Sequence, residues 1–432
     1  MASTYLTRTY QSGGNRKKWT MSMWVKRSKI ESGADNMLFQ SYVSTYTYCP
    51  FDSNDRLRFQ DGSGGNKRTN MKFRDTNAWY HIVVAIDTDL GTADDRYKIY
   101  VNGNRITDFE TSTNPSQGYE GEWNKAQLHN IGRHSSGSGY FDGYMTHIHF
   151  CDGYQYQASD FGETDSATGI WKPKTSPSVN YGTTGFFILK DGNSVTDSSS
   201  NTNNWTINGT LTNMKDNPSN VFATFNPLFP KQAPSTTNMG NTRLDQSSGA
   251  WKSRLTTIGA SSGKYYAEFK AGTISGTKYN QFGVVHEDIV SSGTFQYVGD
   301  STSGWGLNWG GNVNHNGSNV SGYTSFTTGD IIGVAMDLDN HKVYWRKNDG
   351  AWLNSGDPTS GSTGTGAQSL TTGKIYFFAA SVYGNECFAN FGNGYFGTTA
   401  VSSAGTNASG IGIFEYDVPT GYTALSTKGL NE

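Results

Sequence analysis

The sequence predicts an all-β protein made of two β-sandwich, jelly-roll-like domains. Apolar and polar residues alternate with a period of two in many short segments, as expected for strands with one buried face. Aromatic residues, which favour strands, make up 14% of the chain, and 53 glycines accompany many turn-forming Ser, Thr and Asn residues. No stretch repeats apolar residues at helical spacing over three turns. The chain has 432 residues, which is long enough for two such sandwiches.

The first predicted domain spans residues 1–206. Its strand candidates are WTMSMWVKR (19–27), YHIVVAID (80–87), RYKIYV (96–101) and GYMTHIHF (143–150). Asn102 and Gly103 follow the third of these strands and precede Arg105 and Ile106. An Asn-Gly pair between strands predicts a tight hairpin, because both residues tolerate a positive φ.

Residues 207–239 differ in composition and are predicted to be a Pro/Asn-rich, ordered connector. They contain Pro218, Pro227, Pro230 and Pro234, which remove backbone donors and favour extended chain. The run NVFATFNPL (220–228) is apolar enough to dock on a neighbouring domain. We therefore expect a connector that is packed along part of its length.

The second predicted domain spans residues 240–400. Its strand candidates are KYYAEFK (264–270), QFGVV (281–285), GWGLNW (304–309), GDIIGVAMDLDNHKVYWRKNDGAW (329–352), KIYFFAAS (374–381) and ECFANFG (386–392). The long segment contains an Asp339-Asn340 turn and an Asn348–Gly350 turn. Residues 401–432 are predicted to be an extension that packs on this domain as a short strand, through Phe414, Tyr416 and Tyr422.

Charge and cysteine content exclude several classes of partner. The formal net charge of −2 gives no electrostatic support for a nucleic-acid partner. No apolar run approaches the roughly 20 residues that a membrane span needs, and the first ten residues lack the apolar core of a secretory signal. We therefore expect synthesis in a cytoplasm without membrane insertion. The three cysteines, Cys49, Cys151 and Cys387, form no CxxC pair and are predicted to be buried or half-buried.

Two family resemblances follow from these segments. The early tryptophan-rich strand, NAWYHIVVAID (77–87), YKIYVNGNRI (97–106) and FDGYMTHIHFCDG (141–153) resemble laminin-G-like and concanavalin-A-like sandwiches over about residues 1–190. The segments KYYAEFK, GWGLNW, GDIIGVAMDLDNHKVYWRKNDG and KIYFFAASVYGNECFANFG appear in the order of a SPRY domain over about residues 240–396. Both resemblances imply β-sandwich folds.

The combination resembles a group of tailed-phage virion proteins. The segments are MASTYLTRT (1–9), GNRKKWTMSMWVKRS (14–28), DFGETDSATGIWKPK (160–174) and NPSNVFATFNPL (217–228). This resemblance implies a tail-fibre or appendage protein located in the virion and made in the cytoplasm of the bacterial host. The resemblance does not identify which residues of this sequence bind a ligand.

The concanavalin-A-like fold also includes glucanases, so catalysis has to be considered. Retaining glycosidases need two carboxyl groups about 5–5.5 Å apart, which strand positions i and i+4 can supply. The family's Glu-x-Asp-x-x-Glu pattern is missing, and the strand 143–150 carries His147 and His149 in place of carboxylates. Asp337 and Asp339 flank a turn and are predicted to bond nearby backbone amides. The sequence therefore predicts no enzyme.

Two groups of residues have side chains that suit a metal ion, but a structural role explains each group better. His147, His149 and Cys151 would share one strand face, where a fourth zinc ligand is missing. Asp87, Asp89, Asp94 and Asp95 surround a loop whose oxygens would suit calcium. A solvated acidic turn explains these four residues better, since the ligand spacing of an EF-hand is absent. We therefore expect no metal, with calcium as the open alternative.

Aromatic residues near loops are the remaining ligand-binding candidates, because Trp and Tyr combine apolar area with a polar handle. In the first domain they are Trp123, Tyr140, Tyr154 and Tyr156, and in the second they are Trp305, Trp309, Tyr323 and Trp352. Trp305 and Trp309 lie four apart and should face the same side, where we favour burial of both. Trp352 follows a turn and is the strongest candidate for ligand contact.

These observations predict a structural component of a phage virion, present in multiple copies. It would recognise a host-surface glycan or dock on neighbouring virion proteins through loops held by rigid sandwiches. Many copies on one particle would add avidity to weak single sites. The alternatives are a polysaccharide depolymerase and a capsid or tail decoration protein without a receptor role.

Overall fold

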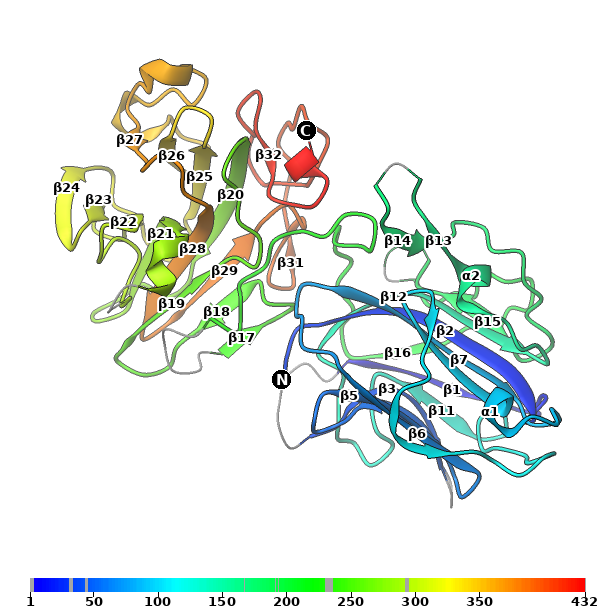
Figure 1. The fold of residues 1–432 in the computed structure, drawn as a ribbon. Coiled ribbons are helices and arrows are strands. Elements are labelled where there is room, and N and C mark those ends of the chain that lie inside the picture. The colour runs from blue at the N-terminus through cyan, green and yellow to red at the C-terminus, as the bar shows by residue number, and fades with distance from the viewer. Residues whose placement is uncertain are drawn as a thin grey trace. The chain divides into compact units, whose positions relative to one another are not determined.

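The computed structural model describes residues 4–30, 34–42, 46–166, 168–190, 192, 194–229, 236–291 and 295–431. The all-β prediction is confirmed, because nearly every element is a strand (Figure 1). The chain divides into two compact units, residues 1–213 and 214–432. The longest helices in the described part of the chain have four residues, so none of them could span a lipid bilayer.

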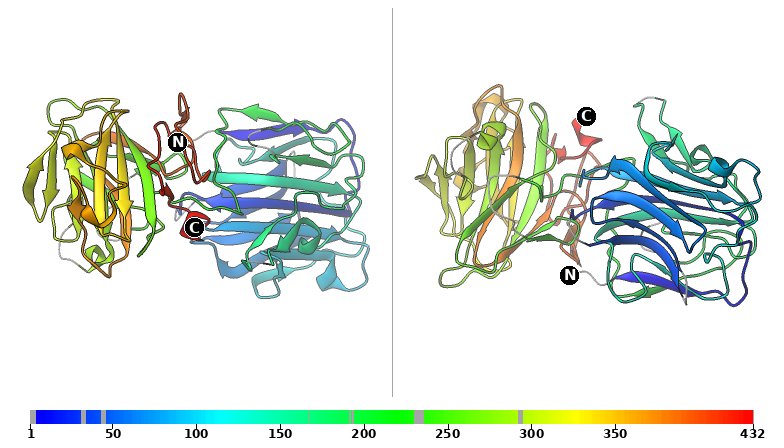
Figure 2. Two further views of the ribbon diagram at one scale, coloured as in Figure 1. Left: turned by 90° about the horizontal axis from the view of Figure 1, so that it is seen from above. Right: turned by 60° about the horizontal axis from the view of Figure 1, so that its bottom comes forward.

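The first unit contains an eight-stranded and a six-stranded antiparallel sheet, plus a two-stranded one. In Figure 2 it is the part coloured blue to green, and its strands lie in layers. The eight-stranded sheet, in spatial order, is β10 (Phe109–Thr113), β6 (Gly65–Lys72), β5 (Arg56–Asp61), β4 (Tyr46–Phe51), β3 (Asn36–Tyr42), β11 (Leu128–Ile131), β1 (Tyr5–Thr9) and β16 (Thr206–Asn208). The six-stranded sheet is β15 (Phe186–Ile188), β12 (Gly143–Asp152), β2 (Lys18–Arg27), β7 (Trp79–Asp87), β8 (Tyr97–Val101) and β9 (Asn104–Arg105).

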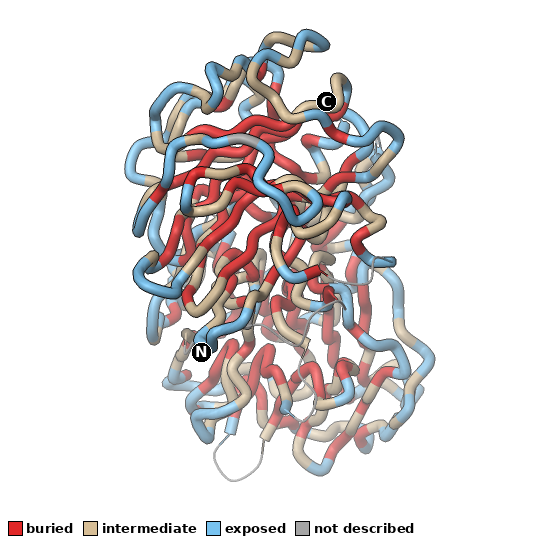
Figure 3. The backbone as a smooth tube through the Cα atoms, turned by 90° about the vertical axis from the view of Figure 1, so that its left-hand side faces the viewer, coloured by how far each residue is buried: buried red, intermediate tan, exposed pale blue. Residues whose placement is uncertain are grey.

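The alternation of side chains along the central strands creates the core of this unit. On β7, Ile82, Val84 and Ile86 enter the main core, where Trp19 and Met21 of β2 also lie. Val83 and Ala85 point to the opposite face, as the period of a strand requires. Both faces of the six-stranded sheet are therefore buried along its middle strands, and Figure 3 shows such buried stretches ending in exposed loops.

A segment that we call the first cover, the described residues of 153–181, lies over the outer face of the six-stranded sheet. It contains α2 (Ala158–Phe161) and the two-stranded sheet of β13 (Gly162–Thr164) and β14 (Trp171–Pro173). Phe161 is 1% exposed and packs in a cluster with Val83 and Cys151. The other helix of the unit, α1 (Ala93–Arg96), joins β7 to β8.

The second unit also contains an eight-stranded and a six-stranded sheet, plus a two-stranded one. The first is β17 (Thr236–Asn238), β18 (Arg243–Asp245), β29 (Glu386–Asn390), β20 (Lys264–Ala271), β25 (Ile331–Asp337), β26 (Lys342–Lys347) and β27 (Gln368–Ser369), with β32 (Thr423–Ala424) parallel to β20. The second is β19 (Trp251–Leu255), β28 (Tyr376–Tyr383), β21 (Tyr279–His286), β22 (Gly304–Asn308), β23 (Asn312–His315) and β24 (Ser318–Gly322). The remaining elements are β30 (Tyr395–Phe396), β31 (Thr399–Ala400), η1 (Glu287–Val290), η2 (Leu353–Ser355), η3 (Gly361–Thr363) and η4 (Gly429–Asn431).

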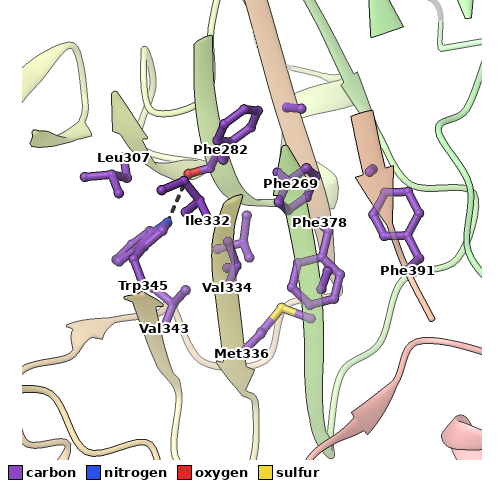
Figure 4. Close-up of a cluster of buried hydrophobic side chains, with 14 of the residues drawn as sticks. Phe269, Phe282, Leu307, Ile332, Val334, Met336, Val343, Trp345, Phe378 and Phe391 are labelled. Atoms are coloured by element: carbon purple, nitrogen blue, oxygen red, sulfur yellow. Dashed lines mark hydrogen bonds between the residues drawn. The ribbon is translucent and has the colours of Figure 1, made fainter. Parts of the chain in front are cut away.

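The core of the second unit lies between its two large sheets. Phe269 of β20 stacks on Phe282 of β21 with ring centroids 5.2 Å apart. Trp345 of β26 is 1% exposed, and its indole N–H donates to the Phe282 carbonyl oxygen at 3.0 Å (Figure 4). The buried indole therefore has the hydrogen-bond partner that its polar atom needs.

The C-terminal segment covers the outer face of the eight-stranded sheet in this unit, and we call residues 401–425 the second cover. Phe414, Val418 and Tyr422 pack with Tyr266 and Tyr344. Beneath them lies the carboxylate of Glu268, which is 0% exposed. It accepts the backbone N–H groups of Glu415 at 2.8 Å and of Tyr416 at 2.9 Å.

Residues of the predicted connector, 207–239, belong to both units. Thr206–Asn208 form β16, an edge strand of the first unit. Phe222, Phe225 and Phe229 are buried in clusters of the second unit. Residues 230–235, with Pro230 and Pro234, lie outside the described residues.

Candidate functional site

Trp123 is not a surface residue, and the prediction that it contacts a ligand is wrong. Its side chain is 0% exposed, and its ring centroid lies 5.0 Å from that of Phe39. Its backbone N–H donates to the Thr47 hydroxyl at 2.8 Å. The loop that carries Trp123 folds inward because the indole fills the space between the sheets. The polar residues around Trp123 in the sequence do not indicate this burial.

A second aromatic candidate of the first unit, Tyr140, is half-buried. Its ring contacts Tyr5 edge to face at 6.0 Å, and Tyr5 also lies under the Arg133 guanidinium at 3.7 Å. Tyr140 therefore belongs to a small group of rings near the start of β1. Its contact with a ligand stays a prediction.

Trp305 and Trp309 are both half-buried and contact the main core of the second unit. Trp305 stacks on His315 with centroids 3.9 Å apart, and Trp309 stacks on Tyr279 at the same distance. The tryptophans thus share their degree of burial, but each has a different ring partner.

Trp352 lies at the start of η2 and packs under the second cover. Its ring is 6.4 Å from both Tyr266 and Tyr344, and the Arg346 guanidinium lies 5.1 Å from its centroid. One part of the indole is therefore committed to intramolecular packing. That Trp352 is the main ligand contact stays a prediction. These contacts give the residue a structural role as the alternative.

The four aspartates of the calcium hypothesis do not converge. Asp87 is 5% exposed and pairs with Lys18 at 2.7 Å. Asp89 pairs with Lys17 at 3.7 Å, and Asp94 accepts the Asn114 amide at 2.6 Å. Asp95 pairs with Arg105 at 2.9 Å, and the hydrogen bond from Arg105 together with the charge of Lys98 lowers the pKa of Asp95. Within the described residues no group of three His, Cys, Asp or Glu side chains could hold a metal ion.

His147 and His149 both contact the Phe187 ring, with centroids 5.9 and 3.8 Å away. The β2–β12 register shifts between Thr146 and His149, and His147 has a φ of 48°. The two imidazoles therefore lie near each other despite a bulge in the strand. His149 is 1% exposed, stacks on Phe187 at 3.8 Å and contacts the Tyr181 hydroxyl at 2.9 Å, and burial lowers its pKa well below the usual value. The cysteines are all buried and free, as predicted.

Ser22 and His81 form a buried contact that resembles a nucleophile and its base; Ser136 with His134 and Thr146 with His147 form similar contacts nearer the surface. The Ser22 hydroxyl lies 2.8 Å from His81 Nε2. However, the Trp171 indole N–H donates to His81 Nδ1 at 3.1 Å, so Nδ1 is the acceptor and Nε2 carries the proton. His81 therefore donates to Ser22 and cannot take its proton, and burial lowers the pKa of His81 to about 3.

Asp337 and Asp339 have the predicted turn-forming role. Asp337 accepts the Asn340 backbone N–H at 3.0 Å and pairs with Lys264 at 3.1 Å. Asp339 accepts the Gly263 backbone N–H at 2.7 Å. Their carboxylates thus fix two neighbouring turns.

A hollow of about 580 Å³ lies on the first unit, where the first cover meets residues 200–201. It is lined by Tyr156, Pro177, Ser178, Val179, Asn180, Tyr181, Ser200 and Asn201. The Tyr156 hydroxyl accepts the Asn180 backbone N–H at 2.8 Å. The Asn201 amide donates to the carbonyls of Gly182 at 2.7 Å and Gly185 at 3.1 Å. None of the lining residues carries a charge, and sequence reasoning singled out only Tyr156 among them.

A second group of surface rings, which we call the aromatic patch, lies on the second unit. Its members are Trp251, Tyr279, Tyr297, Trp309 and Tyr383, all half-buried. The Trp251 centroid lies 5.2 Å from Tyr297 and 5.5 Å from Tyr383. Sequence reasoning identified only Trp309, because the other rings lie on strands or close to one, where burial is the usual expectation.

Comparison with known proteins supports the assignment of both units. Residues 2–154 match the family model of the concanavalin A-like lectin/glucanases superfamily, and residues 264–394 match that of the SPRY domain. A search of curated proteins finds no match. Among solved structures, the chain resembles the SPRY domain of human HERC1 at 18% identity and a TM-score of 0.30, over 38% of this chain and 96% of that one.

It also resembles the stonustoxin structure at 17% identity and a TM-score of 0.29, over 39% of this chain and 27% of that one. The two family matches agree with the β-sandwich architecture and with the resemblances seen in the sequence. This chain therefore combines a concanavalin A-like domain at residues 2–154 with a SPRY domain at residues 264–394.

Proposed function

We propose that this chain is a non-enzymatic binding protein of a phage virion, a tail fibre or another appendage, that recognises a neutral glycan on the host surface. The observation that carries the glycan part of the proposal is the hollow on the first unit. Its volume of about 580 Å³ falls within the usual range of small-ligand sites, about 300–1,000 Å³. The virion part of the proposal is supported by the sequence resemblance to phage appendage proteins.

The chemistry of the hollow suits a sugar. Tyr156 and Tyr181 contribute ring surface, while Ser178 and Ser200 add hydroxyl groups and Asn180 and Asn201 add amides. Rings can pack on the C–H face of a sugar, and hydroxyls and amides can both donate to and accept from its hydroxyl groups. The absence of charge among the lining residues favours a neutral ligand.

The hydrogen bonds of the lining residues make this hollow rigid. The Tyr181 hydroxyl is held by the buried His149, and the Asn201 amide is held by two backbone carbonyls. A ligand would then bind a preformed site, which reduces the entropy lost on binding. Many copies on one particle would turn modest single-site affinity into firm attachment.

The binding test uses a panel of immobilised neutral glycans and the Ser200→Trp variant. Ser200 is exposed, so the indole should obstruct the hollow without disturbing the core. We expect Ser200→Trp to abolish the binding seen with the unmodified chain. Ser166→Trp, at an exposed turn that does not line the hollow, should bind normally. Equal binding by both variants would refute the assignment of the hollow.

The virion and non-enzyme parts need separate tests. Antibody-gold labelling of purified particles should mark the tail or its appendages, whereas labelling of the capsid shell would favour the decoration alternative. Incubation with the same glycans should release no reducing ends. Release that disappears on replacing a single Asp or Glu would establish the depolymerase alternative.

A further inference from the structure

We propose that the aromatic patch of the second unit is a separate binding site for an acidic saccharide, one that carries carboxylate groups. This site would be chemically distinct from the uncharged hollow of the first unit. Its argument begins with the sheet, because neighbouring strands determine where the rings lie.

Strand pairing holds three of the five rings in one row. Trp251 of β19 is the register partner of Tyr383 of β28, and Tyr383 is the register partner of Tyr279 of β21. Directly opposed side chains on one sheet face lie close together. Trp309 joins the row at the end of β22, where its backbone N–H donates to the Asn280 carbonyl at 3.2 Å. Three of the five rings therefore stand on regular strands, and Trp309 directly follows one.

Trp251, Tyr383 and Tyr279 lie on the outer face of the six-stranded sheet. Phe282 and Val284 of β21 point into the main core, so Tyr279, which is an odd number of positions away, points to the other face. Farther along the same face, Val285 is buried with Ile289 and Phe295 beneath the segment that follows β21. One end of the face is thus covered by the chain itself, and the other end carries the rings.

The polar atoms of the rings are available to a ligand. Among the described residues, the two indole N–H groups and the three tyrosyl hydroxyls of the patch have no hydrogen-bond partner, and none is a buried unpaired atom. Each ring therefore buries part of its apolar body and exposes its polar atom. Five such rings present apolar area next to hydrogen-bonding groups, the combination that sugars match with their C–H faces and hydroxyls.

The rim of the patch carries a positive charge. Lys278 is exposed and directly precedes Tyr279. Its side chain lies beside the next turn, since a Cβ on Gly384 would be 3.7 Å from Lys278 Cγ. In the part of the chain that the structure describes, Lys278 has no ion pair. Asp245 and Glu386, on β18 and β29 of the eight-stranded sheet, lie 2.9 and 3.8 Å from Arg243.

This charge selects among the possible saccharides. A cation beside a row of rings favours a sugar whose carboxylate can reach the ammonium group while its ring packs on the aromatic surface. A protein partner would be expected to use aliphatic contacts as well, and the residues that flank the patch include Ser248, Lys278 and Asn308 instead. The observations therefore favour an acidic saccharide chain.

The test compares polygalacturonate, which carries a carboxylate on each sugar, with its neutral methyl ester. We expect the full chain to bind polygalacturonate and to bind the ester about tenfold more weakly. Raising the salt from about 50 mM to about 500 mM should weaken polygalacturonate binding and leave the ester unaffected. Equal affinity for both polymers would refute the acidic class.

Three variants locate the site. Trp251→Ala should weaken polygalacturonate binding about tenfold. Lys278→Gln, at an exposed position, should weaken it about threefold and remove the salt dependence. Tyr383→Phe removes only a hydroxyl and reports on hydrogen bonding even if Trp251→Ala misfolds. Unchanged polygalacturonate binding by Lys278→Gln and Tyr383→Phe would overturn the proposal. Binding of a protein partner alone at the patch would overturn it as well.

Ser200→Trp provides the matched control. It obstructs the hollow of the first unit and should leave polygalacturonate binding unchanged. If Ser200→Trp abolishes polygalacturonate binding, the acidic ligand sits in the hollow and the patch proposal fails. Failure of neutral glycan binding, by contrast, would refute the function proposed for the first unit and leave this site unaffected.

Discussion

Both units cover the outer face of one sheet with irregular chain, but they use different interactions to hold that chain. The first cover is held through apolar contacts, with Phe161 packed in the cluster of Val83 and Cys151. The second cover is held through aromatic contacts and a buried carboxylate, since Glu268 accepts two of its backbone N–H groups. The same architectural need is met once by apolar packing with hydrogen bonds between neutral groups, such as Trp171 with His81, and once by burial around a carboxylate.

The difference matters because a buried charge makes stability depend on pH. Glu268 also accepts hydrogen bonds from the Tyr266 hydroxyl and the Asn390 amide at 3.2 Å each. These bonds favour the ionised carboxylate, yet desolvation outweighs them and raises the pKa of Glu268 to about 7. Beneath the first cover lie His81 and His149, and burial lowers the pKa of both, which keeps them neutral.

The largest expected effect concerns the start of the second unit. Fragment 240–432 lacks Phe222, Phe225 and Phe229, which are buried in three clusters of this unit. Losing a buried phenylalanine costs about 3–5 kcal/mol, and whole domains are stable by only about 5–15 kcal/mol. We expect fragment 214–432 to unfold cooperatively in calorimetry and fragment 240–432 to show no transition. Equal melting temperatures for the two fragments would show that these phenylalanines do not contribute to the core.

The next largest effect tests the apolar cover. Phe161→Ala should lower the free energy of unfolding of the first unit by about 3 kcal/mol, because the site is fully enclosed. Phe161→Leu, which keeps most of the volume, should cost less than about 1.5 kcal/mol. Calorimetry of the full chain should show a lower melting temperature for the first unit alone. A matching shift in the second unit would contradict the separation of the two cores.

The third effect tests the charged cover. The pKa of Glu268 is raised from 4.5 to about 7, so between these values the folded chain holds a proton that the unfolded chain has released. The resulting stabilisation is fully present below about pH 4.5 and is lost as pH rises through about 7, by at most about 3 kcal/mol.

Denaturant titration from pH 4.5 to 8 should therefore show the second unit losing stability in the unmodified chain. Glu268→Gln should lack the pH dependence of stability that Glu268 contributes. Its amide N–H group would face backbone donors and lower stability at every pH. Identical slopes in the two proteins would show that Glu268 is ionised throughout.

The smallest effect concerns the acidic loop of the first unit. Asp89 is exposed and pairs with Lys17 at 3.7 Å, so Asp89→Asn should leave the melting temperature unchanged. Addition of calcium should likewise produce no shift in either protein. A calcium-dependent rise that Asp89→Asn removes would restore calcium as a ligand of this loop.

Local signals predicted several elements correctly. Asn102 and Gly103 have φ values of 47° and 86° and form the two-residue turn between β8 and β9. The long segment from Gly329 to Trp352 contains the β25–β26 hairpin, with Asp337 and Asp339 bonding backbone amides as predicted. These features depend on neighbouring residues, so sequence patterns contain them.

The misplaced features depend on distant contacts. The inward position of Trp123 depends on Thr47 and Phe39, and no local pattern contains them. The bulge at His147 shifts the β2–β12 register, which the alternation of the sequence did not indicate. The aromatic patch joins β19, β21 and β28, so strand order across the sheet had to be known before Trp251, Tyr279 and Tyr383 could be brought together.

The parallel pairing of β32 with β20 has a consequence for biosynthesis. The residues that cover Tyr266 and Tyr344, from Phe414 to Ala424, come near the end of the second unit, so the ribosome synthesises them last. Until they emerge, the nascent unit exposes aromatic side chains and lacks the pairing that β32 gives to Tyr265 and Tyr266 of β20. Such surfaces promote aggregation of incomplete chains. The first unit, whose cover ends by residue 181, can complete its sandwich while the second is still being translated.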